Sequence, residues 1–208
     1  MSLFSQHDLF GNNHGVVNNL LPKDGVVEIY PSFFKKKESE FLLDYLLHKI
    51  EWQQDSMKFY GKQINLPRLT AWYGDNLKNY SYSGIDLNPK PWTKELLFIK
   101  NSIEEHSGLE FTSVLLNLYR NGNDSVSWHR DNEKVLGVNP IIASVSFGAT
   151  RTFKLRHVDD HSLVRIVEMT DGMYILMKSE TQHKWEHSIP KTSRNVKERI
   201  SLTFRILF

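Results

Sequence analysis

The sequence predicts a mainly β protein of the α+β class, with a jelly-roll core of antiparallel strands and helices at its flank. From residue 111 to the C-terminus nearly every apolar segment is short, and turn-forming sequences such as NGND, GVNP and TDG separate most of these segments. Short strands at this spacing are typical of a β-sandwich or barrel. The predicted strands are FTSVLLNLY, IIASVSF, TFKLRH, LVRIVEM, MYILMK and ERISLTFRILF.

Two segments ahead of this core have the apolar periodicity of amphipathic helices. The first covers Glu38–Ile50, where large apolar residues recur at helical spacing. The second runs from Pro91 to His106, because Pro91 suits the first position of a helix and Gly108 suits the residue at which a helix stops.

The rest of the N-terminal half lacks such periodicity. Residues 1–24 are polar and irregular, so we expect a flexible tail followed by a single domain over residues 25–208. The domain opens at Val26, where VVEIYPSFF predicts a strand and a turn. Residues 52–90 are rich in aromatic, basic and turn-forming residues, which predicts strands and loops outside the 111–208 core.

Composition narrows the possible functions. The formal net charge of the 208 residues is only +2, so binding to nucleic acid would need a local basic patch. The absence of cysteine excludes disulfides, thiolate-bound metals and a cysteine nucleophile, and leaves histidine and carboxylates as metal ligands. The first residues lack the pattern of a secretory signal, and no apolar stretch approaches the roughly 20 residues that span a bilayer. We therefore expect a cytoplasmic protein without a membrane association.

The first chemical signal is a His-x-Asp pair formed by His129 and Asp131. In an extended segment, residues two apart point to the same side, so both side chains can face one point. If a later strand brings His187 close, the three ligands form the two-histidine, one-carboxylate set that suits non-heme Fe(II). Taken alone, a His-x-Asp pair is more often a surface or hydrogen-bonded histidine than a metal site.

The last predicted strand, residues 198–208, carries an unusual polar face. Its period-two pattern places apolar residues on one side and Arg199, Ser201, Thr203 and Arg205 on the other. A solvent-facing amphipathic strand is one interpretation. If this face instead lines the interior, its guanidinium groups need an anion such as a dicarboxylate.

A second predicted strand carries a similar polar pair. In VLLNLYRNG, Asn117 and Tyr119 share a face and could hydrogen-bond the same ligand. The alternative is a core tyrosine beside a capped turn.

Several motifs in this order resemble the AlkB family, whose DNA-repair members are the most similar. The motifs are Asn117-x-Tyr119, His129-x-Asp131-x-Glu133, PIIASVSFGATRTF, the HSIP of residues 187–190 and Arg199-x5-Arg205, with YGKQINLPR, WYGD, YSYSGI and LNPKPW ahead of them. The resemblance runs from about residue 58 to the end of the chain. It implies a double-stranded β-helix core over residues 111–208, with residues 52–90 as a nucleotide-recognition lid.

The resemblance also implies the cofactors and the residues that bind them. Fe(II) would be held by His129, Asp131 and His187, with O2 and 2-oxoglutarate as cosubstrates. The residues that match the family's 2-oxoglutarate site are Asn117, Tyr119, Arg199, Thr203 and Arg205. One position departs from the pattern, because Ser201 stands where the repair enzymes usually have asparagine.

The activity that the resemblance implies is oxidative demethylation of alkylated bases in DNA, of the 1-methyladenine and 3-methylcytosine type, with release of formaldehyde, succinate and CO2. Such a base must leave the stack to reach the iron. By resemblance, Tyr82 would stack on the flipped base and Tyr80 would lie at the pocket mouth. Tyr60, Gly61 and Lys62 would form a finger that probes the duplex, with Tyr60 as a wedge.

Three further residues are expected to contact the substrate. Arg68 is a candidate phosphate contact. Lesions methylated on the pairing edge are often cationic, so Glu133 beside the pocket would favour them electrostatically, and Asn132 stands where some relatives have aspartate.

Two alternatives remain open at this stage. The same chemistry could act on RNA or on a protein side chain, or the chain could be a nucleic-acid-binding module without catalysis. We expect a monomer. The segment QHDLF also resembles a peptide that docks on sliding clamps, with Gln6, Leu9 and Phe10 as the contact residues.

Overall fold

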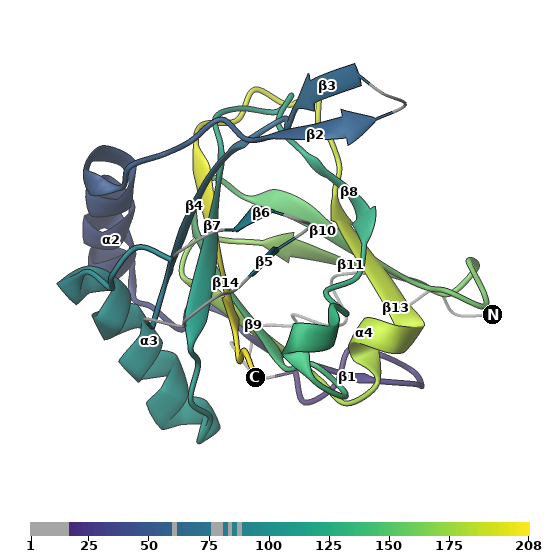
Figure 1. Cartoon of the computed structure of the whole chain (residues 1–208). Coiled ribbons are helices and arrows are strands. Elements are labelled where there is room, and N and C mark those ends of the chain that lie inside the picture. Colours follow the sequence, from purple (N-terminus) through teal and green to yellow (C-terminus); the bar gives the residue numbers. More distant parts are fainter. Residues whose placement is uncertain (1–16, 60–61, 76–80, 83–84, 87–88) are drawn as a thin grey trace.

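The computed structural model describes residues 17–59, 62–75, 81–82, 85–86 and 89–208, and two facing antiparallel sheets form its centre (Figure 1). The larger sheet has the strand order β1 (Val26–Tyr30), β12 (Met173–Lys178), β9 (Ile142–Gly148), β14 (Arg199–Arg205), β7 (Ser113–Tyr119) and β4 (Leu69–Gly74). The smaller sheet has the order β11 (Val164–Met169), β10 (Arg151–His157), β13 (Trp185–Ile189) and β8 (Val126–His129). This arrangement confirms the predicted jelly-roll fold.

Shorter elements surround the two sheets. The helices are α2 (Lys36–Lys49), α3 (Lys94–Ser107) and α4 (Thr181–Lys184), with a 3-10 turn, η1, at Lys134–Leu136. Two hairpins are formed by β2 (Ser56–Phe59) with β3 (Lys62–Asn65) and by β5 (Ser81–Tyr82) with β6 (Ile85–Asp86). No helix in the described part of the chain is long and apolar enough to cross a membrane.

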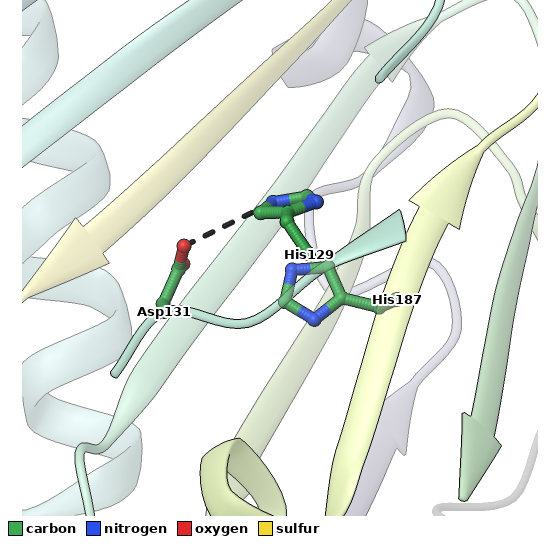
Figure 2. A group of neighbouring side chains, drawn as sticks. All are labelled: His129, Asp131 and His187. Atoms are coloured by element: carbon green, nitrogen blue, oxygen red, sulfur yellow. Dashed lines mark ion pairs between the residues drawn. The ribbon is translucent and has the colours of Figure 1, made fainter. Parts of the chain in front are cut away.

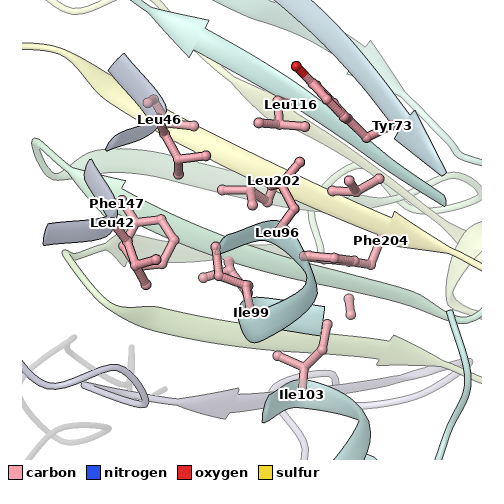
Figure 3. Close-up of a cluster of buried hydrophobic side chains, with 14 of the residues drawn as sticks. Leu42, Leu46, Tyr73, Leu96, Ile99, Ile103, Leu116, Phe147, Leu202 and Phe204 are labelled. Atoms are coloured by element: carbon pink, nitrogen blue, oxygen red, sulfur yellow. The ribbon is translucent and has the colours of Figure 1, made fainter. Parts of the chain in front are cut away.

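One hydrophobic core lies between the larger sheet and the helices α2 and α3 (Figure 3). Leu42 and Leu46 of α2 and Ile99 of α3 are completely or almost completely buried against it. The sheet contributes Leu202 and Phe204, which belong to the apolar face predicted for the last strand. Because this face of β14 is buried against the helices, its polar face must turn toward the smaller sheet.

The second core lies between the two sheets. It joins Ile175 of β12 and Ile29 of β1 to Leu155 of β10 and Trp185 of β13. This packing holds the two sheets together, and some of its residues, such as Tyr119 and Phe153, also line the cavities described below.

The helix boundaries differ slightly from the prediction. The prediction that Pro91 opens the second helix is wrong, because α3 begins at Lys94 and Thr93 caps it by accepting a hydrogen bond from the backbone N–H of Leu96 at 3.2 Å. A hydroxyl before the first turn satisfies a backbone donor, which proline at that place does not do. The stop at Gly108 is confirmed by its left-handed φ of 70°.

The expectation of a flexible tail is wrong for residues 17–24. Val17 pairs with Ile29 at the edge of the larger sheet, and Leu20 and Leu21 are buried in the second core. The side-chain oxygen of Asn19 stabilises this segment, because it accepts hydrogen bonds from the backbone N–H groups of Leu21 and Val27. Gln6, Leu9 and Phe10 lie outside the described residues, so the contact with a sliding clamp stays a prediction.

The boundary predicted between lid and core is also wrong at one strand. β4 lies inside the 52–90 segment, yet it pairs with β7 along its whole length, and its Ala71 and Tyr73 are buried in the first core. Its apolar residues do not alternate regularly, because both of its faces are partly covered. β1 likewise belongs to the larger sheet although it precedes residue 111.

Candidate active site

Three side chains converge where β8 ends beside β13 (Figure 2). His129 is the last residue of β8, and it lies directly opposite His187 of β13 in the sheet. Asp131 follows two residues after the strand. One potential ligand atom from each residue lies within 4.8 Å of the others, and the histidine Nε2 and aspartate Oδ1 of the His-x-Asp pair are 3.9 Å apart. This spacing fits a single metal ion bound by two histidines and one carboxylate.

Two contacts fix the orientation of these groups. The Nδ1 atom of His129 lies 2.8 Å from the carbonyl oxygen of Ser127, an arrangement in which Nδ1–H donates and Nε2 is left to bind a metal. The backbone N–H of Asp131 donates to the side-chain oxygen of Gln182 at 3.0 Å. Gln182 is completely buried on α4, and its amide nitrogen donates to the sulfur of Met177. The sequence contains no signal for this role of Gln182, because the contact spans 51 residues.

Burial and neighbouring charges keep both buried groups ready to bind a cation. Burial alone would raise the pKa of Asp131, but the positive charge of Arg205 and the adjacent histidines outweigh it and lower that pKa to about 2. Burial lowers the pKa of His187 to about 3, and His129 adds to this effect. At neutral pH Asp131 is therefore ionised and His187 is neutral, which are the forms that bind metal.

These shifts predict how the stability of the metal-free protein depends on pH. The pKa of His187 falls from its ordinary value of 6.5 to about 3 on folding, so the unfolded chain binds the extra proton between these values. The free energy of unfolding should therefore decrease as the pH falls through this window, by at most about 1.4 kcal/mol per pH unit for one proton. Asp131 acts in the same direction nearer pH 3, because its pKa is also lowered.

Urea denaturation of the metal-free protein between pH 4 and 7 measures this effect. His187→Gln should make the stability less dependent on pH, whereas His183→Gln, at an exposed position of α4, should leave the dependence unchanged. Equal slopes for the wild-type protein and His187→Gln would contradict the assignment.

A cavity of about 500 Å³ adjoins the three side chains. The residues predicted to bind 2-oxoglutarate all line it: Asn117, Tyr119, Arg199, Thr203 and Arg205. Ser201 lines it as well, and its Oγ lies 3.4 Å from the Oγ of Ser144. The polar face of β14 therefore points into the protein, and the alternative of a solvent-facing strand is excluded.

Arg199 is the buried cation of this cavity. Its Nε donates to the Oγ of Ser146 at 2.9 Å, and its Nη1 has no hydrogen-bond partner among the described residues. Burial lowers the pKa of Arg199 to about 10, so the guanidinium is still charged at neutral pH. A buried cation with an unused donor fits an anionic ligand such as a carboxylate.

Two other arginines have contacts that the sequence did not predict. Arg205 donates to the Oδ2 of Asp131 at 2.9 Å, so this cavity residue also contacts the metal-binding carboxylate. Arg68 donates from Nε to the side-chain oxygen of Asn117 at 2.7 Å. Arg68 thus lines the cavity and is partly buried, and its role as a phosphate contact stays a prediction.

A second, smaller cavity of about 120 Å³ lies next to the first. Arg68, Leu115 and Arg205 line both cavities, and Trp72, Leu136 and Glu133 line only the smaller one. The Oε2 atom of Glu133 is buried and has no hydrogen-bond partner in the described part of the chain. An unsatisfied buried carboxylate oxygen beside this cavity indicates a place for a donor or cationic ligand.

The remaining predicted substrate residues are only partly visible. Tyr60, Gly61 and Tyr80 lie outside the described residues, and so does the side chain of Tyr82. Lys62 is exposed on β3 of the β2–β3 hairpin. Asn132 is exposed and lines neither cavity, whereas Glu133 before η1 faces the smaller one, and the predicted substrate contact of Asn132 stays a prediction.

Comparison with known proteins agrees with this geometry. The sequence model of the 2OG-Fe(II) oxygenase superfamily, a protein-family model, matches residues 26–205. The chain is 40% identical over 208 residues to human alpha-ketoglutarate-dependent dioxygenase alkB homolog 3, covering 95% of this chain and 72% of the relative. It is 34% identical over 187 residues to the bovine DNA oxidative demethylase ALKBH2, covering 85% of this chain and 67% of the relative. The solved structure of OsALKBH1 superposes with a TM-score of 0.59 at 14% identity, covering 86% of this chain and 96% of that one.

The fold, the buried arginine and the two-histidine, one-carboxylate site together define an oxygenase that uses Fe(II), 2-oxoglutarate and O2. The chain belongs to the AlkB family of these enzymes. The alternative of a binding module without catalysis is therefore set aside.

Proposed function

We propose that this dioxygenase removes methyl groups from alkylated bases in DNA, with 1-methyladenine and 3-methylcytosine as substrates. The observation that carries the proposal is the unpartnered carboxylate oxygen of Glu133 in the small cavity, which shares Arg68 and Arg205 with the cavity of the metal-binding side chains. A base methylated on its pairing edge brings a positive charge or an amino group that this oxygen can bind. The names of two relatives, a dioxygenase and a DNA oxidative demethylase, support the same chemistry.

Fe(II), 2-oxoglutarate and O2 supply the oxidising chemistry that hydroxylates a methyl group and releases it as formaldehyde. In this proposal His129, Asp131 and His187 hold the metal. Arg199 would bind a carboxylate of 2-oxoglutarate, with its guanidinium held in place by the hydrogen bond to Ser146. Arg205 keeps Asp131 ionised and oriented through its hydrogen bond to Oδ2.

The substrate base would enter the smaller cavity after leaving the stack. Trp72, Leu115 and Leu136 provide apolar walls, and the polar side chains that line the cavity include Glu133 and Asp55. Arg68 separates this space from Asn117 and the cosubstrate, because it lines both cavities and is hydrogen-bonded to Asn117. Tyr82 stacking on the base, and Tyr60 acting as a wedge with Gly61 and Lys62, remain part of the proposal.

The test is incubation with Fe(II), 2-oxoglutarate and matched oligonucleotides that carry 1-methyladenine in DNA or in RNA. Formaldehyde, succinate and the repaired base are measured, and unmethylated oligonucleotides serve as controls. We expect formaldehyde and repaired base from the DNA substrate. Repair of RNA alone would favour RNA as the substrate, and a lack of product from both, with iron and 2-oxoglutarate bound, would overturn the proposal.

A substitution of Glu133 separates base recognition from the iron chemistry. Glu133→Gln keeps the shape of the side chain but removes its charge, so kcat/KM for cationic 1-methyladenine should fall by roughly 10- to 100-fold, the equivalent of a charged hydrogen bond. The decrease for neutral 1-methylguanine should be smaller. Succinate formation without nucleic acid should stay within about twofold of wild type, and an equal loss with both bases would contradict charge recognition.

A further inference from the structure

The two histidines are held by a weakly connected part of the smaller sheet. β8 has four residues and lies at the edge of that sheet, with β13 as its neighbour. Only two register pairs join them, His187 with His129 and Ile189 with Val126, and the register shifts between these pairs. A bulged edge pairing leaves a strand less firmly placed than a regular ladder does. Another contact must therefore fix β8 relative to β13.

Arg151, at the start of β10, makes that contact. Its Nη2 donates to the carbonyl oxygen of Asp124 at 2.8 Å and to that of Pro190 at 2.7 Å. Its Nη1 donates to the carbonyl oxygen of Asn121 at 3.1 Å. Asp124 lies two residues before β8 and Pro190 directly follows β13, so one guanidinium joins the two loops that lead to and from the strands of the histidines.

The same guanidinium also lies against Tyr119, one of the residues predicted to bind 2-oxoglutarate. The Cζ atom of Arg151 is 5.5 Å from the centroid of the Tyr119 ring, and the Cζ of Arg199 is 5.2 Å from it. Tyr119 is almost completely buried and lines the larger cavity. Arg151 therefore contacts the metal-site strands and the cosubstrate wall without itself reaching the metal-binding side chains.

Simple neutralisation of charge does not explain this arrangement. The side chain of Arg151 is buried, with 2% of the residue exposed, and all three of its acceptors are uncharged carbonyl groups. The carboxylate of the nearby Asp124 is instead bound in a two-point contact by Arg120. Three carbonyls around one planar group need the rigid fork of arginine, which the single ammonium of lysine does not reproduce.

We propose that Arg151 is a positioning residue that sets the separation of His129 and His187 and the placement of Tyr119. The inference rests on the metal and cosubstrate roles given above. If the inference is correct, removal of the Arg151 guanidinium weakens metal binding in a protein that is still folded. The KM for 2-oxoglutarate should then also rise, because Tyr119 loses its support.

The test compares Arg151→Lys and Arg151→Met with Arg165→Met. Arg165 lies on β11, at the opposite edge of the smaller sheet from β8, and its Nε donates to the carbonyl oxygen of Leu20. The dissociation constant of Mn(II) is measured on each metal-free protein, together with its melting temperature and the KM for 2-oxoglutarate. We expect about a 10- to 100-fold weaker Mn(II) affinity for both Arg151 variants, the range for partners that orient metal ligands. The Arg165 variant should stay within about twofold of wild type.

Arg151→Lys retains the positive charge, so it can be tested even if Arg151→Met does not fold. If both variants are too unstable at room temperature, the increase in melting temperature at saturating Mn(II) replaces the titration, and it should be smaller than in the wild-type protein. Folded Arg151 variants with wild-type Mn(II) affinity, or an unchanged thermal shift, would overturn the inference. These measurements use no nucleic acid, so a failure of the demethylation assay is a separate result.

Discussion

His129→Ala should abolish turnover and weaken binding of Mn(II) or Fe(II) to the metal-free protein by more than about 100-fold. Changes to residues that only orient metal ligands already cost 10- to 100-fold, so removal of a ligand should cost more. His129 is half-buried at the end of β8, and its Nδ1 is already occupied by the carbonyl of Ser127. Truncation of this partly exposed side chain to alanine should therefore affect metal binding much more than folding.

The matched control is His183→Ala. This histidine lies on α4, four residues before His187, and is exposed. The HxxxH spacing of His183 and His187 resembles a metal-binding pair on a helix, yet only His187 belongs to the group of converging ligands. We expect wild-type activity and metal affinity for His183→Ala. Loss of metal binding in this variant, with retention in His129→Ala, would show that the wrong histidine has been assigned.

Arg199→Met should raise the KM for 2-oxoglutarate by about 30-fold or more. Truncation of one partner of a buried, hydrogen-bonded charge pair costs 2 kcal/mol or more, which corresponds to this factor at room temperature. Arg199 is almost fully buried, and its Nη1 has no partner among the described residues, so the ligand supplies the missing contact. The effect should appear in the KM for 2-oxoglutarate and not in the affinity of the metal-free protein for Mn(II).

The same substitution should not destabilise the protein in the absence of ligand. A buried guanidinium without a carboxylate is unfavourable, so its replacement by an apolar side chain of similar length should leave the melting temperature unchanged or raise it. Arg165→Met is the matched control: Arg165 lies in the smaller sheet, its Nε donates to the carbonyl of Leu20, and its loss should leave the KM unchanged. An unchanged KM in Arg199→Met would exclude Arg199 as the carboxylate-binding residue.

A strand could be predicted from the sequence where only one of its faces packs against apolar residues. The period-two pattern of β14 separates Leu202 and Phe204, packed under the helices, from Arg199 and Arg205, which line the cavity. β4 was not recognised as a core strand, because Thr70 and Gly74 are buried as well as Ala71 and Tyr73, and Leu69 and Trp72 are partly buried. A strand covered on both faces carries no alternation that sequence analysis can detect.

The sequence by itself determined the jelly-roll class, the family and the identity of the three converging side chains, because these depend on local alternation and on motifs read in order along the chain. Only the tertiary structure decided that Arg205 contacts Asp131, that Arg68 turns inward to Asn117, and that Glu133, but not Asn132, faces a cavity. The first two contacts join residues 74 and 49 positions apart, and the third depends on the turn at η1. The register of packed sheets sets such contacts, and no periodicity within one strand encodes them.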